Sequence, residues 1–162
     1  MTPLILLPAP ERPYRDLVRD LEAMGWVWAG EPQRLPLIRG EPEQVDWRHP
    51  AGGRMRYRFN PAVRLRQISA EGPPAALAPL SLLPRLDEAG ISRLLGEADT
   101  ESVLRGVLAA RAVGADRFVD ALGGLRRHGD PLIRAAADET LAELSEGAEH
   151  RRRRPRSSVP TR

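Results

Sequence analysis

The spacing of the apolar residues changes partway along the chain, and this change restricts the folds that the chain can adopt. Between residues 45 and 69, apolar and polar residues alternate, most clearly from Arg54 to Phe59. Such alternation is typical of a strand that buries one face and exposes the other. From Asp87 onward, apolar residues recur every three or four positions, as they do in amphipathic helices. The sequence therefore predicts an α+β fold, with the strands in its first half and a helical second half.

The alternating region divides into three strands at two turn sequences, Ala51-Gly52-Gly53 and Asn60-Pro61. Before it, residues 11–25 have apolar side chains at helical spacing. We therefore expect an N-terminal helix packed on a three-stranded antiparallel meander, within residues 1–70. A further short strand is indicated around Leu35, Leu37 and Ile38. The expected apolar face of the sheet consists of Trp47, Met55, Tyr57, Phe59 and Leu65.

Residues 71–86 combine four prolines with five leucines. An ordinary solvated linker would be polar instead. We therefore interpret this segment as a strap whose leucines are buried between the two halves of the molecule.

Four helices are expected between residues 87 and 145. Asp87, Thr100, Asp116 and Asp130 each precede an apolar stripe, and each side chain can accept a hydrogen bond from the first helical turn. After Ser145 the apolar pattern stops, and residues 146–162 contain six arginines. We expect these last residues to form a disordered basic tail.

The second and fourth expected helices match each other at an offset of 29 residues. Val103, Leu104 and Arg105 align with Leu132, Ile133 and Arg134, and the two preceding helices match at an offset of about 28. A helix–turn–helix unit repeated at such a period is typical of α-solenoids. The alternative explanation is a plain four-helix bundle whose two amphipathic helices agree by chance.

The run Asp130-Pro131-Leu132-Ile133-Arg134, with Ala137, resembles the short HEAT-like repeat. The earlier unit has Glu101-Ser102 in place of Asp-Pro, and the resemblance covers residues 87–145. It implies two HEAT-like helical hairpins that serve as a scaffold for protein interactions, with no particular reaction. It also implies structural roles for Asp130 as a cap and for Arg105 and Arg134, which would bond backbone or acidic groups between adjacent repeats.

Charge is distributed unevenly along the chain. The formal net charge is +3 and all 25 basic residues are arginines, but residues 150–162 hold six of them and no acid. The remainder then carries 19 arginines against 22 acids, so the part expected to fold is mildly acidic. This balance argues against nucleic-acid binding by the protein as a whole.

Composition also restricts location and chemistry. The chain has no cysteine, which excludes disulfides and thiol chemistry. The apolar run near the N-terminus is too short to cross a membrane, so we expect a cytoplasmic protein without membrane contact. The histidines, His49, His128 and His150, do not pair at metal-ligand spacing.

Gly123-Gly124 lacks the sequence context of a phosphate loop, and we interpret it as a site of close helix packing. No nucleophile motif is present. We therefore expect no catalytic, cofactor-binding or metal site, and we expect that the protein is not an enzyme.

An arginine-rich strand face is the clearest surface feature. Arg54, Arg56 and Arg58 share one side of one expected strand, and Arg64 and Arg66 are expected on the same side of the next. Like charges side by side repel, so either local acids and solvent or an acidic partner should balance them. The aromatic residues alternate to the opposite side, which disfavours base stacking.

These observations leave three functional hypotheses. The first is a bacterial cytoplasmic adaptor that binds another protein. The second is a nucleic-acid-associated protein that uses the arginine face and the basic tail, and the third is a regulatory or accessory subunit of an enzyme.

Overall fold

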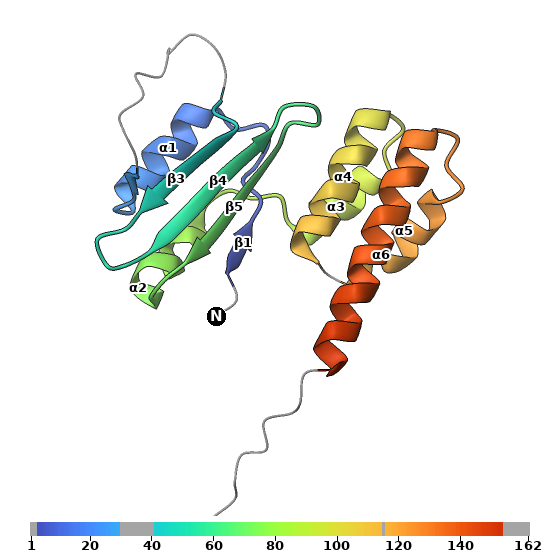
Figure 1. Ribbon diagram of the computed structural model, residues 1–162. Coiled ribbons are helices and arrows are strands. Elements are labelled where there is room, and N and C mark those ends of the chain that lie inside the picture. The colour runs from blue at the N-terminus through green and yellow to red at the C-terminus, as the bar shows by residue number, and fades with distance from the viewer. Residues whose placement is uncertain (1–2, 30–40, 115, 154–162) are drawn as a thin grey trace, which may run out of the picture.

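The computed structural model describes residues 3–29, 41–114 and 116–153. It has an α+β fold in which a five-stranded antiparallel sheet is followed by several packed helices (Figure 1). The sheet has the strand order β1-β5-β4-β3-β2. Its strands are β1 (Leu4–Leu6), β2 (Val27–Trp28), β3 (Gln44–Arg48), β4 (Arg54–Asn60) and β5 (Leu65–Glu71).

The predicted meander is confirmed as the centre of this sheet, because β3, β4 and β5 are antiparallel neighbours. The predicted number of strands is wrong, since β1 and β2 add an edge strand on each side. These edge strands have only three and two residues, which is too short for a periodic pattern to show. In addition, β1 pairs with β5, far along the chain, with Leu4 opposite Ala70. The strand expected around Leu35, Leu37 and Ile38 lies outside the described residues.

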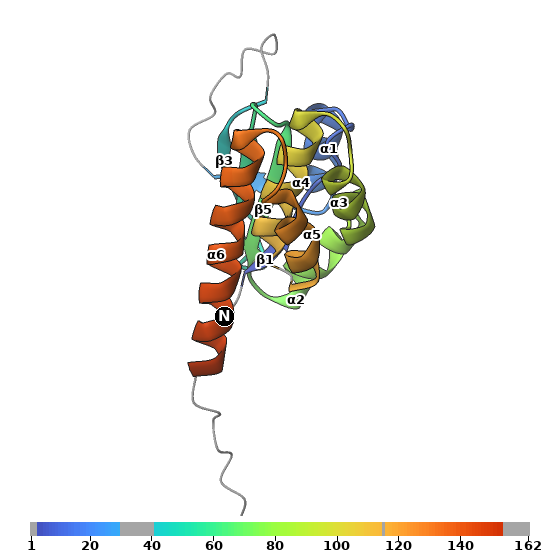
Figure 2. The same cartoon turned by 90° about the vertical axis from the view of Figure 1, so that its right-hand side faces the viewer.

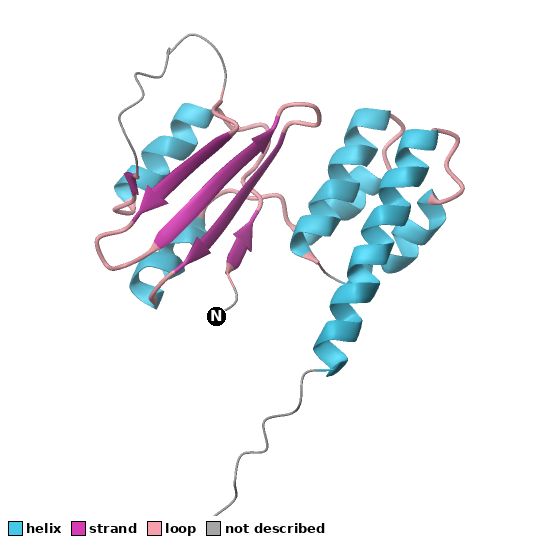
Figure 3. Ribbon diagram, in the orientation of Figure 1, coloured by secondary structure: helices cyan, strands magenta, loops and turns pink. Residues whose placement is uncertain are grey.

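One face of the sheet is covered by α1 (Tyr14–Ala23) and α2 (Pro74–Leu77), as Figures 1 and 3 show. Leu17 and Leu21 of α1 are buried in the core beneath this face. Gly25 follows the helix with a φ of +96°, a conformation that suits glycine and ends the helix. The N-terminal helix is therefore confirmed within its predicted range.

The predicted strap is partly helical. It forms α2 and a 3-10 helix, η1 (Ala78–Leu82). Leu80 and Leu83 are buried in the core of the sheet, and Leu86 packs against the helical core. Leu82, by contrast, is 79% exposed, so the leucines of this segment are not all buried as expected.

The helices after the strap are α3 (Glu88–Leu95), α4 (Thr100–Val113), α5 (Val119–Leu125) and α6 (Pro131–Arg153), with η2 (Asp116–Phe118) before α5. α3 packs on α4, α4 on α6, and α5 on α6. Asp87 caps α3 by accepting from the Gly90 amide, as predicted. Asp99, not Thr100, caps α4, because its carboxylate accepts from the Ser102 amide.

α6 continues well past the predicted end of the helices at residue 145. It extends to Arg153 and projects beyond the other helices in Figures 1 and 2. The predicted disorder is therefore wrong for residues 146–153, and residues 154–162 lie outside the described part. Helix formers such as Glu146, Ala148 and Arg152 continue the helix without an apolar stripe.

The burial of α4 and α6 does not follow the predicted offset of 29. Val103 is 1% exposed, whereas its predicted counterpart Leu132 is 61% exposed. The buried positions match at an offset of 30 instead, Val103 with Ile133 and Val107 with Ala137. The described helices form no solenoid. The packing role expected for Gly123 and Gly124 is also wrong, because a Cβ added at either position would meet nothing within 4 Å.

The apolar interior consists of two clusters. One lies between the sheet, α1 and the strap, and the other lies among the helices. The helical cluster also contains Leu7, Val63 and Leu65 from the sheet half, so it is completed by residues of both halves. No helix in the described part of the chain is both long enough and apolar enough to cross a membrane.

Candidate functional site

The face of the sheet opposite α1 is polar and rich in arginine. Arg54, Arg56 and Arg58 of β4 are exposed on it, as predicted from their alternation. Residues opposite each other in an antiparallel pair point to the same side of the sheet. The register therefore adds neighbours to this face on both sides of β4: Gln44, Asp46 and Arg48 from β3, and Gln67, Ser69 and Glu71 from β5. We call these nine residues the open face.

Cationic side chains outnumber carboxylates on the open face, with four arginines and two acids. The Arg56 Nε atom lies 3.0 Å from an Asp46 carboxylate oxygen, and this hydrogen bond raises the pKa of Arg56 above its ordinary value. Within the described residues, Arg48, Arg54 and Arg58 make no ion pair. Their charges are therefore balanced mainly by solvent.

The open face is hollowed along its centre. The hollow has a volume of about 620 Å³, and its lining includes eight of the nine open-face residues, all but Gln44. The aromatic residues of the three central strands lie on the covered side, because Trp47, Tyr57 and Phe59 are opposite Met55, Ile68 and Arg66. The open face therefore offers guanidinium and amide groups but no aromatic ring for stacking.

Arg64 and Arg66 do not join the open face, so the predicted side for both residues is wrong. Arg64 is exposed in the turn between β4 and β5, with a φ of +53°. Arg66 lies opposite Phe59 on the covered side and is only 4% exposed. The prediction assumed that the alternation of sides continues without a break through the turn. In the structure, pairing resumes with Leu65 opposite Asn60, so the sides of Leu65 and Arg66 are the reverse of those predicted. Leu65 thus starts on the open side, where it is buried in the helical core.

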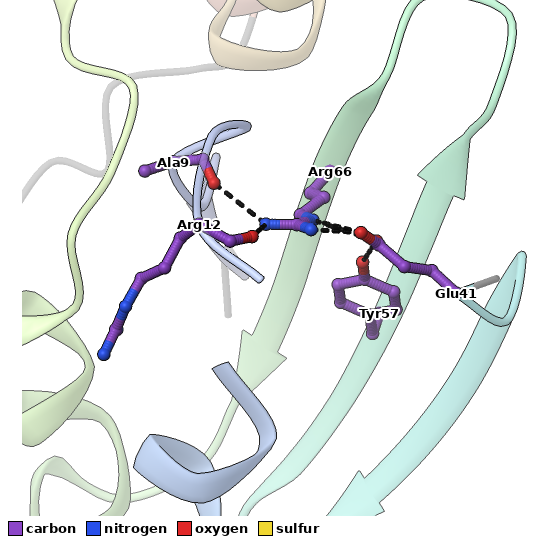
Figure 4. A network of polar contacts seen from close by, with 5 residues as sticks. All are labelled: Ala9, Arg12, Glu41, Tyr57 and Arg66. Atoms are coloured by element: carbon purple, nitrogen blue, oxygen red, sulfur yellow. Dashed lines mark hydrogen bonds and ion pairs between the residues drawn. The ribbon is translucent and has the colours of Figure 1, made fainter. Parts of the chain in front are cut away.

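Arg66 is the centre of a buried polar network (Figure 4). Its Nε atom donates to Glu41 at 2.9 Å, a terminal nitrogen completes a bidentate ion pair with the same carboxylate, and the other donates to the carbonyls of Ala9 and Arg12. The Tyr57 hydroxyl donates to Glu41 at 2.5 Å. Burial opposes the charged form of Arg66, but the hydrogen bonds and attraction of Glu41 outweigh it and raise its pKa.

Both tyrosines lie beside this network. Burial raises the pKa of Tyr14 to about 12, and burial with the Glu41 hydrogen bond raises the pKa of Tyr57 further. The ring centroids of Tyr14 and Tyr57 are 5.4 Å apart. The Tyr14 hydroxyl is buried and has no hydrogen-bond partner among the described residues. The network holds the β1–α1 connection and Glu41 against β5, and is therefore structural.

The three predicted repeat positions lie among the helices. Arg105 Nε donates to the Val63 carbonyl at 2.5 Å, which joins α4 to the turn between β4 and β5. Arg134 donates to the carbonyls of His128 and Gly129, just before its own helix. The resemblance implied that both arginines join adjacent repeats. Neither of these contacts does so. Asp130 caps α6 through the Leu132 amide, and the Thr100 hydroxyl donates to the same carboxylate at 3.2 Å.

No group of three or more acidic or histidine side chains in the described ranges is arranged to hold a metal ion. His49 instead has a structural role, because its Nε2 atom lies 2.9 Å from the Met24 carbonyl and its Nδ1 atom accepts from the Ala51 amide.

Comparison with protein-family models, curated proteins and solved structures gave no match.

Proposed function

We propose that this chain is a cytoplasmic adaptor module whose open face binds an acidic surface of another protein. The observation that carries the proposal is the local excess of arginine on a solvent-exposed sheet face, within a fold whose residues before 150 carry more acids than arginines. Charge complementarity of this kind accelerates association and selects against wrong partners. The proposed role is binding, without a catalytic step.

The helices form the second part of the proposal. Although the described helices form no solenoid, we interpret α3 with α4 and α5 with α6 as two helical hairpins with the protein-interaction role that the HEAT-like resemblance implies. The contacts of α4 with α6 support this interpretation, as does the Thr100–Asp130 hydrogen bond between their N-terminal ends. The buried positions of α4 and α6 match at an offset of 30 instead of the predicted 29, so the two hairpins are not exact copies of one repeat.

A nucleic-acid partner is the second candidate, and the exposed Arg152 and Arg153 near the end of α6 favour it. A single strand would gain affinity by stacking bases on aromatic rings. The described strands place their large aromatic residues on the covered side, so the open face could contact only phosphates. Such binding would weaken steeply with salt and tolerate many sequences. The third candidate, an accessory subunit of an enzyme, differs from the first only in its partner.

The deciding experiment changes Arg54, Arg56 and Arg58 to glutamine. The full chain and this triple variant are used to capture partners from the native host, and each captured protein is then purified and its affinity measured directly. We expect the triple variant to associate more slowly and bind more weakly, while its melting temperature stays nearly unchanged because exposed charges add little stability.

A second triple variant is the matched control. Arg85, Arg93 and Arg127 are exposed and make no ion pair within the described residues, so changing them to glutamine lowers the net charge equally at other sites. The control should keep full affinity. Equal loss in both triple variants would show that only net charge matters. Submicromolar binding of random single-stranded RNA at physiological salt, abolished by the open-face changes alone, would select the second candidate.

A further inference from the structure

A second hollow adjoins the open face, at the end of the sheet where the helices pack. It has a volume of about 600 Å³ and lies between the β4–β5 end of the sheet and α4. Its lining combines polar groups with an apolar wall, and the apolar wall includes Pro61, Leu65, Leu108 and Ala112. Contact with this wall would remove part of an apolar side chain from water.

The two hollows are adjacent, because Arg58 and Gln67 line both of them. The two arginines that line the second hollow differ in whether a carboxylate already binds them. Arg111, on the α4 side of the second hollow, is already held by the carboxylate of Glu143, with its Nε atom at 2.6 Å. Arg58 makes no ion pair within the described residues. The junction therefore presents the Arg58 guanidinium, which has no ion pair within the described residues, beside an apolar wall, and the Glu43 carboxylate also lines the second hollow.

We propose that the second hollow takes an apolar side chain of a protein partner whose neighbouring carboxylates bind Arg58 and Arg54. The partner segment is thus acidic with an embedded leucine-like residue. This inference rests on the proposed function and adds the chemistry of the partner. Arg54 and Arg58 are four residues apart along β4, which is about 13 Å, a spacing that residues four apart in an extended segment can match. A phosphate backbone would match the arginines but would leave the apolar wall without a contact.

The test uses the full chain and synthetic peptides as probes. One peptide of about a dozen residues has glutamates around two leucines, and a second has serines in place of the leucines. Burial of a leucine-sized side chain predicts that the leucine peptide binds about tenfold more tightly. Calorimetry gives the affinities, and amide chemical shifts show whether Leu108 and Ala112 respond only to the leucine peptide.

Two variants separate the contributions of charge and apolar contact. Arg58→Gln should weaken both peptides alike. Ala112→Gln extends a polar side chain into the hollow and should lower the affinity of the leucine peptide to that of the serine peptide, with no effect on the latter. Ala121→Gln, at an exposed position of α5, is the matched control and should change neither affinity.

Equal affinity of the two peptides would overturn the inference and leave the proposed function standing, provided the open-face triple variant still loses its partner. Failure of both peptides to bind would also overturn it. If the triple variant in addition keeps its partner, the proposed function falls as well. Tighter binding of single-stranded RNA than of the leucine peptide would assign the junction to nucleic acid and would likewise overturn the inference.

Discussion

The sheet half and the helical half hold their interiors together by different means. In the sheet half, the buried Arg66 guanidinium is matched by Glu41, Tyr57 and two backbone carbonyls. In the helical half, the one buried polar side chain of the described residues is Thr140, whose hydroxyl donates to the Ala136 carbonyl of its own helix. Both halves have an apolar core, and the sheet half adds one buried ionic network to its core, which the described helical half does not.

Two consecutive residues of β5 belong to the interiors of different halves. Leu65 is buried in the helical core, whereas the side chain of Arg66 lies on the covered side of the sheet. Arg105 adds a hydrogen bond from α4 to the Val63 carbonyl in the preceding turn. A change at one side of this junction should therefore affect both halves.

The largest expected effect is loss of folding when the halves are separated. Residues 87–153 expressed alone lack Leu7, Val63 and Leu65, which complete the helical core. We expect this fragment to give a broad, non-cooperative thermal transition by circular dichroism, whereas the chain ending at Arg153 melts cooperatively. A monomeric fragment with a sharp transition would show that the helices are an independent domain.

The next largest effect is expected from breaking the ionic network. Glu41→Ala leaves the Arg66 guanidinium buried without its counter-charge, and loss of one partner of a buried pair costs about 3–5 kcal/mol. Urea unfolding of the full chain measures this loss. As a control, Glu41→Gln combined with Arg66→Met removes both charges and should recover much of the stability. If Glu41→Ala unfolds like the parent, the network is dispensable.

The two tyrosines provide a smaller, pH-dependent comparison within the sheet half. Because the folded-state pKa of Tyr14 is raised from 10 to about 12, its contribution to stability is complete below pH 10 and is lost as the pH rises through 12. After allowance for partial exposure, this loss is about 1–2 kcal/mol. Urea unfolding across this pH range measures it, and tyrosinate absorbance of the folded protein should rise only near or above pH 12.

Replacing each tyrosine with phenylalanine distinguishes their roles. Tyr14→Phe removes a hydroxyl without a described partner and should leave stability at neutral pH unchanged or slightly higher. Tyr57→Phe removes the hydrogen bond to Glu41 and should cost about 1.5–3 kcal/mol. Equal losses for the two variants would contradict this assignment.

The smallest effects concern glycines in the helical half. Gly124→Ala in α5 adds a Cβ into open space and should stabilise the protein by up to about 1 kcal/mol. Gly106→Ala in α4 is the control, because its Cβ would come within 3.0 Å of Leu94 and the Leu95 backbone. It should therefore destabilise the contact between α3 and α4. Thermal melting of both variants checks the opposite signs.

Much of the candidate site follows from the sequence alone. Alternation places Arg54, Arg56 and Arg58 on one side of a strand, and the turn sequences on either side of β4 fix its length. The register across the strands adds what the sequence does not show, including the pairing of Arg56 with Asp46. The second hollow could not be predicted, because it forms only where α4 packs against the end of the sheet.

By itself, the sequence determined the three central strands, the position of α1 and the capping of α3 and α6, because these depend on neighbouring residues. Tertiary structure decided the faces of Leu65 and Arg66, the addition of β1 and β2, and the environment of Gly124. Alternation specifies sides within one strand but not across a turn, since the turn sets where pairing resumes. Edge strands and glycine environments depend on contacts between distant segments, which local periodicity does not encode.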